Sequence, residues 1–134
     1  MERRTRSGRR GYTLIELIIV MAIISVLIAV AVPLYTKSIA RTKESLLRQN
    51  LFTLRTVIDE YTFDKKAAPQ RLEDLVEAGY LRAVPIDPMT GSERTWRVIM
   101  EDALTSVDQT QPGIFQVFSG SDGRSLEGTQ YSEW

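Results

Sequence analysis

The sequence predicts an α+β protein in which one long N-terminal helix packs on a small antiparallel β-sheet. Three observations support this fold class. An apolar segment of helical length occupies residues 14–35, and an amphipathic helical pattern continues it. Short strand patterns, separated by glycine- and proline-containing turns, then occupy the C-terminal part. The part after the apolar segment has roughly 100 residues, which build only a modest core, so we expect one folded domain there.

The composition argues against several classes of function. The chain has no cysteine and no histidine, which excludes a disulfide scaffold, a thiolate zinc site and a cysteine nucleophile and removes the commonest general base. Lys plus Arg equals Asp plus Glu, 17 each, but residues 1–11 carry five arginines and one glutamate. The remaining residues are therefore acidic overall, which argues against a nucleic-acid-binding domain. We find no catalytic constellation and no phosphate-binding loop, so no enzyme is predicted.

The apolar segment between Arg10 and Lys37 is long enough to span a membrane. Its only charged residue is Glu16, and about 20 apolar residues suffice to cross a bilayer core. Isoleucine, valine and leucine fill every face of the helix, so there is no single stripe that could pack on a water-soluble core. The arginines before the segment place the N-terminus in the cytoplasm, although further basic residues after it weaken the asymmetry. We therefore predict a transmembrane helix at residues 12–35.

Two simpler targeting segments compete with this interpretation. A cleaved secretory signal has an apolar region of about 7–15 residues that ends at small residues before the cleavage site. Here the apolar run is longer, and its best small residues, Ala29 and Ala31, lead into Pro33 and a further helical pattern. An uncleaved signal anchor is the second alternative.

Glu16 is a carboxylate inside the predicted membrane segment. Such a group costs roughly 2.5–3.5 kcal/mol at mid-bilayer and less near the edge. One interpretation is a boundary charge that snorkels to the headgroups. In the other, a cut after Gly11 gives Tyr12 a free α-amino group, and the amine of a neighbouring subunit pairs with Glu16. An unpaired buried charge is heavily penalised, so this pairing predicts a packed array of helices with a fixed axial offset.

Residues 11–16, Gly-Tyr-Thr-Leu-Ile-Glu, follow a short basic leader and precede the apolar helix. They resemble the class III prepilin signal of type IV pilins and type II secretion pseudopilins. The resemblance implies cleavage after Gly11 by a prepilin peptidase and N-methylation of Tyr12, where the family usually has phenylalanine. It also assigns the family's assembly glutamate to Glu16 and its helix-kinking proline to Pro33. Since proline lacks an amide hydrogen, we expect a kink or local unwinding there.

An amphipathic helix is predicted at residues 35–63, continuous with the membrane segment, because apolar residues recur at spacings of three and four. Its predicted core face comprises Ile39, Leu46, Leu47, Leu51, Leu54, Val57, Ile58 and Tyr61. The charged residues expected on its other faces are Lys43, Glu44, Arg48, Arg55 and Asp59.

The segment after this helix is predicted to alternate between short elements and turns. Residues 65–69 are a loop, and residues 70–78 form a short helix that Gly79 ends. Two prolines make residues 81–88 an extended segment in which Asp87 is a turn former, and residues 89–92 follow as a turn.

The strand predictions lie at residues 95–100 and 113–119, and a short segment at 104–107 is expected to pair with the first. Trp96 and Val98 share one side of the first strand. Strict alternation in the second strand puts Ile114, Gln116 and Phe118 on one side and Phe115 and Val117 on the other. Residues 120–128 form a polar loop, after which the aromatic anchors are Tyr131 and Trp134.

Residues 72–88 and 113–123, together with Trp134, resemble the major, G-type pseudopilins of type II secretion. The lack of cysteine fits this subgroup, since many type IVa pilins close their C-terminal loop with a disulfide. G-type pseudopilins commonly hold calcium in this loop, and the resemblance implies a weak calcium site formed by Ser121, Asp122, Glu127 and backbone carbonyls. The family's later acidic pair is missing here, and calcium prefers about six to eight oxygens. An ordinary turn at Asp122 is therefore the alternative.

The resemblance implies a structural subunit of a type II secretion pseudopilus, a filament that drives protein export across the outer membrane. Residues 1–11 are then a cleaved cytoplasmic leader, residues 12–35 the filament-core helix, and residues 36–134 a periplasmic domain of type IV pilin-like fold. The expected partners are further copies of the chain, the prepilin peptidase, minor pseudopilins, the inner-membrane secretion platform and the lipid bilayer, without nucleic acid. Two alternatives remain: a type IV pilin for adhesion, motility or DNA uptake, and a monomeric, membrane-tethered binding domain or enzyme.

Overall fold

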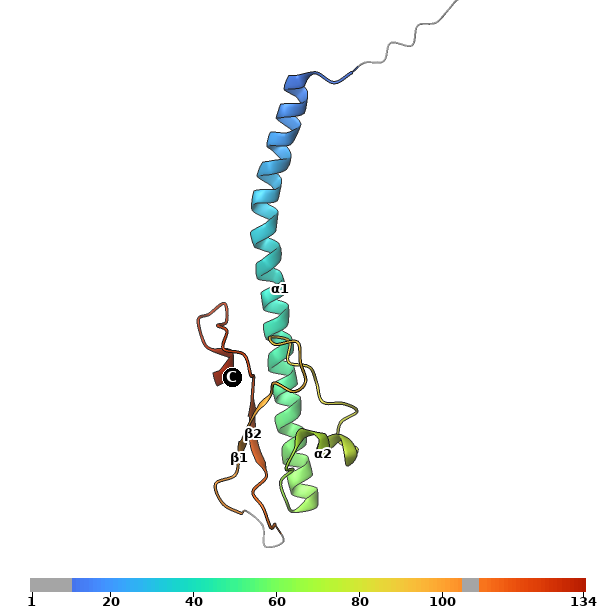
Figure 1. The fold of residues 1–134 in the computed structure, drawn as a ribbon, viewed down its shortest axis with the longest axis vertical. Helices are drawn as coiled ribbons and strands as arrows, with labels where there is room; N and C mark the ends of the chain where they lie inside the picture. The colour runs from blue at the N-terminus through green and yellow to red at the C-terminus, as the bar shows by residue number, and fades with distance from the viewer. Residues whose placement is uncertain (1–10, 105–108) are drawn as a thin grey trace, which may run out of the picture. The chain divides into compact units, whose positions relative to one another are not determined.

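The computed structural model describes residues 11–104 and 109–134 (Figure 1). Its elements are helix α1 (Leu14–Lys65), helix α2 (Leu72–Glu77), strand β1 (Arg97–Met100), strand β2 (Ile114–Phe118) and the 3-10 helix η1 (Tyr131–Glu133). The chain divides into two compact units, the first ending at Thr36 and the second spanning Lys37–Trp134. Residues 1–10 of the leader expected at residues 1–11 lie outside the described residues, as does most of the strand expected at residues 104–107.

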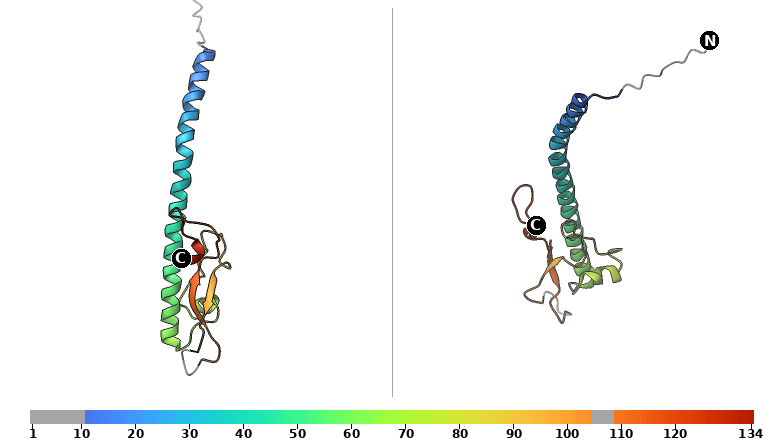
Figure 2. Two further views of the ribbon diagram at one scale, coloured as in Figure 1. Left: turned by 90° about the vertical axis from the view of Figure 1, so that its left-hand side faces the viewer. Right: turned by 45° about the horizontal axis from the view of Figure 1, so that its top comes forward.

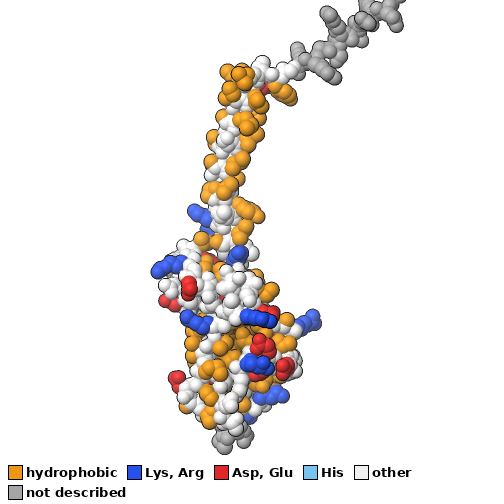
Figure 3. All heavy atoms as spheres, in the orientation of Figure 1, with side chains coloured by type: hydrophobic (Ala, Val, Ile, Leu, Met, Phe, Trp, Pro, Cys, Tyr) orange, Lys and Arg blue, Asp and Glu red, His pale blue; other side chains and the backbone are white. Residues whose placement is uncertain are grey.

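The described part of the first unit is helical from Leu14 onward, as predicted. The side chains of residues 11–36 are all exposed, and Figure 3 shows hydrophobic side chains along this part of α1. By length and composition α1 can cross a membrane, since its most apolar 18-residue window has a mean hydropathy of 3.1 and is 0% buried. The helix runs through Pro33 without a break. Of the kink or local unwinding expected at Pro33, the unwinding is absent, because a single proline removes one backbone hydrogen bond and leaves the flanking turns helical. The kink stays a prediction.

The core of the second unit forms between α1 and the elements that follow it. The side chains that α1 buries there are Leu47, Leu51, Leu54, Val57 and Ile58, as the periodicity predicts, with Tyr61 packed against them. The other elements contribute Leu72, Leu75, Trp96, Ile114, Val117 and Tyr131. Two predicted core residues are exposed instead, Ile39 and Leu46. Ile39 is exposed because it lies before Glu44, the first residue of α1 that is buried. Leu46 is exposed because its side chain points about 100° away from that of the buried Leu47.

The sheet consists of β1 and β2 in antiparallel pairing, beside the second half of α1 (Figure 2). The register pairs Ile99 with Gln116 but Met100 with Ile114, so Phe115 is an extra residue in β2. Such a bulge interrupts the alternation of faces. Ile114 and Val117 are consequently both buried, while Phe115 is 65% exposed. The predicted strict alternation, which put Ile114 and Val117 on opposite sides, was wrong for this reason.

The predictions for the first strand and the short helix agree better with the structure. Trp96 is buried and Val98 is partly buried next to it, whereas Arg97 and Ile99 between and after them are exposed. Helix α2 is shorter than predicted, and Gly79, with φ of +84°, follows its C-terminus. A left-handed backbone of this kind ends helices and favours glycine. Residues 81–88 contain no helix, as expected, and residues 88–91 form a turn.

Candidate assembly site

The N-terminus of α1 carries the residues that the prepilin resemblance singled out. Gly11 and Tyr12 precede the helix and are exposed, as is Glu16. The Oγ1 atom of Thr13 accepts a hydrogen bond of 3.2 Å from the Glu16 backbone N–H. Thr13 thus caps the helix and places Glu16 in the first turn, where the helix dipole favours a negative charge. We missed this cap in the sequence, although Thr-x-x-Glu is a recognisable capping pattern.

Glu16 has no oppositely charged partner within residues 11–104 and 109–134, where the ion pairs are those of Arg71. The surface around it is apolar, because Tyr12, Leu17 and Val20 line a shallow hollow together with Glu16. The carboxylate therefore lies among side chains suited to lipid or to another apolar helix. This geometry is compatible with both interpretations of Glu16, the snorkelling charge and the charge paired with a neighbouring subunit.

Glu44 is a buried carboxylate that fastens the C-terminal segment to α1. Its side chain is 5% exposed, and its Oε1 atom accepts hydrogen bonds from the Leu126 N–H at 2.7 Å and from the Tyr131 hydroxyl at 3.0 Å. We had expected Glu44 on a solvent-facing side, which was wrong. Its spacing of three before Leu47 and seven before Leu51 places it on the core side of the helix. A buried carboxylate is tolerated there because these two donors replace its hydration.

The predicted aromatic anchors, Tyr131 and Trp134, pack against the core. Their rings meet edge to face, with centroids 5.3 Å apart. Burial, and then the hydrogen bond to Glu44, raise the pKa of the Tyr131 hydroxyl above its usual value. Arg55 of α1 donates to the backbone carbonyls of Val117 at 2.9 Å and Trp134 at 2.5 Å. The segment from Tyr131 to Trp134 is therefore attached to α1 by two contacts, one to Glu44 and one to Arg55.

Asp87 is a second buried carboxylate. Its Oδ1 atom accepts the Met89 N–H at 2.8 Å, which confirms the predicted turn-forming role. Its Oδ2 atom accepts the Ser119 hydroxyl at 2.6 Å and the Gly120 N–H at 3.2 Å. Asp87 thus also connects the turn before β1 to the chain just after β2, and its hydrogen-bonding capacity is used within the fold.

The calcium prediction concerns Ser121, Asp122 and Glu127. Ser121 is partly buried, and its Oγ atom accepts the Gly123 N–H at 3.2 Å, whereas Asp122 and Glu127 are exposed. Among the described residues there is no group of three or more Asp, Glu, His or Cys arranged to hold a metal. Calcium usually requires several carboxylates among its six to eight or so oxygens. These residues therefore fit the ion poorly, and the site stays a prediction.

Comparison with known proteins identifies relatives of two kinds. Residues 6–32 match the family described as the prokaryotic N-terminal methylation motif. The chain is 43% identical to the type IV major fimbrial protein FimA of Dichelobacter nodosus over an aligned stretch of 63 residues. This stretch covers 47% of this chain and 40% of that protein. It is 31% identical over 104 residues to the type II secretion system core protein G of Pseudomonas aeruginosa, covering 66% of this chain and 71% of that protein.

The type II secretion system core protein G of Escherichia coli K12 is similar to the same degree, 30% identical over 101 residues and covered to 70% of its length. The chain spans about 40% of the length of the fimbrial relatives it matches first. No solved structure matches the chain. These relatives are structural proteins and not enzymes, which confirms that expectation. The methylation motif and the match to most of the core protein G relatives show that the chain belongs to the family of type IV pilins and pseudopilins.

Proposed function

We propose that the chain is the subunit of a helical filament of the type II secretion pseudopilus class. The observation that carries this proposal is the apolar half of α1, whose side chains are all exposed. It begins with one carboxylate, Glu16, that has no ion-pair partner among the described residues. A continuous apolar surface of this size needs a cover. Lipid covers it before assembly, and the same helices of neighbouring subunits cover it in the filament.

Glu16 sets the axial offset between neighbouring helices in this proposal. Cleavage after Gly11 leaves Tyr12 with a positively charged, N-methylated α-amine, four residues before Glu16. If this amine pairs with Glu16 of a neighbour, the two helices are offset by about 6 Å, since a helix rises by about 1.5 Å per residue. The pairing neutralises both charges in apolar surroundings, where each alone is costly. Pro33 lies in the same helix and is assigned to the packed core of the filament.

Maturation and location follow from the same arrangement. Residues 12–35 hold the precursor in the inner membrane, residues 1–11 form the cytoplasmic leader that a prepilin peptidase removes, and residues 36–134 lie in the periplasm. The assembled filament drives protein export across the outer membrane, with minor pseudopilins and the inner-membrane platform as partners.

The coverage of the relatives favours a pseudopilin over a pilin. The chain covers 71% of the core protein G of Pseudomonas aeruginosa but 28% of the type IV major pilin protein PilA of Myxococcus xanthus, to which it is 46% identical over 62 residues. The higher local identity to the pilins keeps a type IV pilin for adhesion, motility or DNA uptake as the second candidate. A chain that remains monomeric in the membrane is the alternative of a different class.

The decisive experiment replaces Glu16 by leucine in the full-length chain and counts filaments by electron microscopy. We expect filaments to be lost while the protein remains in the membrane. Glu60→Leu is the matched control, because Glu60 is an exposed glutamate of the same helix in the second unit. Filaments that form equally well with Glu16→Leu would contradict the proposal.

The mass of the intact protein from its native membrane tests maturation separately. A species that starts at Tyr12 and carries one additional methyl group supports the prepilin route. A species that starts at Met1, or after Ala31, identifies an uncleaved anchor or an ordinary signal sequence instead.

A further inference from the structure

A groove with basic and aromatic walls lies beside the second half of α1. Its lining residues are Arg48, Leu51, Phe52, Arg55, Glu127, Thr129 and Trp134. The Arg48 guanidinium lies over the Trp134 ring, 4.2 Å from its centroid, and Phe52 is 72% exposed next to it. An exposed aromatic ring between two arginines is a combination that is enriched in protein–protein interfaces.

Neither arginine forms an ion pair with an Asp or Glu among the described residues, where the ion pairs are those of Arg71. Arg55 donates from one terminal nitrogen to backbone carbonyls, and its Nε atom is buried without an acceptor. Desolvation lowers the pKa of Arg55 from its usual value, and the group remains a cation at neutral pH. Glu127 also lines the groove but forms no ion pair with either arginine within the described residues. The lining therefore carries two cations against one carboxylate and is positively charged on balance.

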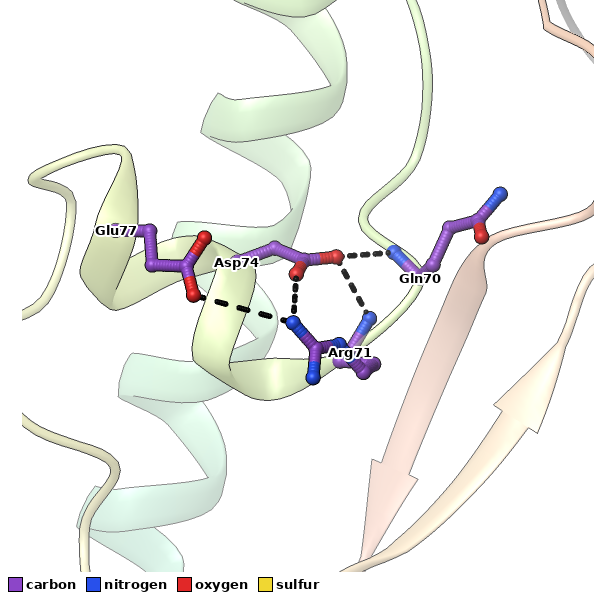
Figure 4. Close-up of polar contacts among 4 residues, drawn as sticks. All are labelled: Gln70, Arg71, Asp74 and Glu77. Atoms are coloured by element: carbon purple, nitrogen blue, oxygen red, sulfur yellow. Dashed lines mark hydrogen bonds and ion pairs between the residues drawn. The ribbon is translucent and has the colours of Figure 1, made fainter.

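The opposite flank of the second unit is acidic. Glu73 and Glu77 are both exposed on α2, and their spacing of four places them on one face of that helix. Arg71 contacts Asp74 at 3.4 Å and Glu77 at 3.9 Å, so it offsets part of this charge (Figure 4). In the part of the chain that the structure describes, Glu73 forms no ion pair. Arg82 lines the same hollow as three carboxylates, those of Glu73, Glu77 and Glu93. Three carboxylates therefore face one arginine there, and this edge of α2 is negatively charged on balance.

The groove and the α2 edge face away from each other. Figure 1 shows β2 and the C-terminal segment on one side of α1 and α2 on the other. Helical geometry agrees, since Arg48 and Arg55 lie on the side of α1 that meets Trp134. Asn50, on the opposite side, donates to the carbonyl of Ile86 in the segment that follows α2. Complementary surfaces on opposite flanks of one molecule produce a head-to-tail contact that can repeat without closing.

We propose that the groove between Arg48, Phe52 and Trp134 binds the α2 edge, with Glu73 and Glu77, of a second copy of this chain. The contact rests on the proposed filament and adds to it a lateral interface between the soluble units. Each copy uses its groove for one neighbour and its α2 edge for another. The partner is fixed by charge: an acidic helix edge fits this groove, whereas a basic surface is repelled.

The first test reverses charges in the full-length chain. Arg48→Glu alone and Glu73→Lys alone are each expected to reduce filament yield by roughly tenfold, since like charges at a contact cost several kcal/mol. The double variant, which restores opposite charges, is expected to recover filaments. Lys65→Glu is the matched control, because Lys65 is an exposed basic residue at the far end of α1. Recovery in the double variant also excludes misfolding of the single variants as the cause.

The second test leaves the two arginines of the groove and the two glutamates of α2 in place and uses the absence of native cysteine. One chain carries Glu127→Cys at the rim of the groove and the other carries Ala78→Cys at the end of α2. We expect disulfide-linked dimers when the two chains are expressed together, because cross-linking requires Cα atoms within about 7 Å. Either variant expressed alone is expected to give no cross-link, since the contact is head-to-tail.

The outcomes separate this inference from the proposed function. If Glu16→Leu abolishes filaments while the charge reversals leave their yield unchanged and no mixed cross-link forms, the lateral contact is wrong and the filament proposal stands. If filaments form regardless of Glu16, the filament proposal itself fails. Cross-links within each single variant would identify a two-fold contact between like surfaces and would overturn the head-to-tail arrangement.

Discussion

The Tyr131 hydroxyl donates a 3.0 Å hydrogen bond to the carboxylate of Glu44, 87 positions earlier in the chain. The same carboxylate oxygen accepts the backbone N–H of Leu126 at 2.7 Å. One side chain of α1 therefore fixes both the loop after β2 and the 3-10 helix η1. A buried carboxylate requires hydrogen-bond donors, and a buried donor requires an acceptor. Removing either Glu44 or its donors therefore leaves the other group without a hydrogen-bond partner.

Glu44→Ala is expected to destabilise the second unit by about 1–3 kcal/mol, because it leaves the buried Tyr131 hydroxyl and the partly buried Leu126 N–H without their acceptor. Glu44→Gln keeps an acceptor oxygen and should cost less. Urea unfolding of the full-length protein in detergent, monitored by circular dichroism, measures the loss of stability in both variants. Glu60→Ala at an exposed position of α1 is the control, and an unchanged midpoint for Glu44→Ala would show that the contact contributes nothing.

The stability of the second unit should fall at alkaline pH. Burial and the Glu44 hydrogen bond raise the pKa of Tyr131 above 10.0, so the folded state holds this proton more tightly than the unfolded state. The contribution is therefore fully present below pH 10.0 and is lost as the pH rises through the raised pKa. Unfolding midpoints measured from pH 8 to pH 12 or so should decrease less steeply in Tyr131→Phe.

Tyr80 provides the comparison for this experiment. Its hydroxyl donates to Asp64 at 2.8 Å, and this hydrogen bond, followed by desolvation, raises its pKa as well. Tyr80→Phe removes this second contribution but leaves the Glu44 contact intact. A pH dependence that is the same in the parent chain and in Tyr131→Phe would contradict the role assigned to Tyr131.

Calcium is expected to have little effect on the loop at residues 120–128. Asp122 and Glu127 are exposed, and the described residues do not gather three acidic ligands, so the donor set is weak for this ion. Unfolding midpoints with calcium and with a chelator should agree, while Glu44→Ala lowers the midpoint in both. A stabilisation by calcium that disappears in Asp122→Asn would instead establish the predicted site.

The helices could be predicted from the sequence because their determinants are local. The length of the uniformly apolar segment predicted the first half of α1, the three-and-four spacing of apolar residues predicted the second half, and Gly79 marked the end of α2. Which side chains of β2 are buried could not be predicted, because the bulge at Phe115 exists only in the pairing with β1. Glu44 lies on the core side by spacing, but its burial depends on Leu126 and Tyr131, which are distant in sequence and therefore invisible to a local pattern.

Gly120→Ala should be among the most damaging single substitutions in the second unit. A Cβ atom at this position would overlap the backbone carbonyl of Thr95, which cannot rotate away as a side chain can. The Gly120 N–H also donates to the buried carboxylate of Asp87 at 3.2 Å. Moving the backbone to relieve the overlap would therefore weaken the connection between the turn before β1 and the end of β2.

We expect Gly120→Ala to lower the free energy of unfolding by about 1–3 kcal/mol, the range for overpacked sites. The measurement is urea unfolding of the full-length chain, as for Glu44. Ser45→Ala is the control, because Ser45 is an exposed residue of α1 in the second unit, where a surface substitution is expected to change the stability little. Equal midpoints for Gly120→Ala and the parent chain would show that residues 95 and 120 separate readily, and hence that the Asp87 contact does not hold these two segments together.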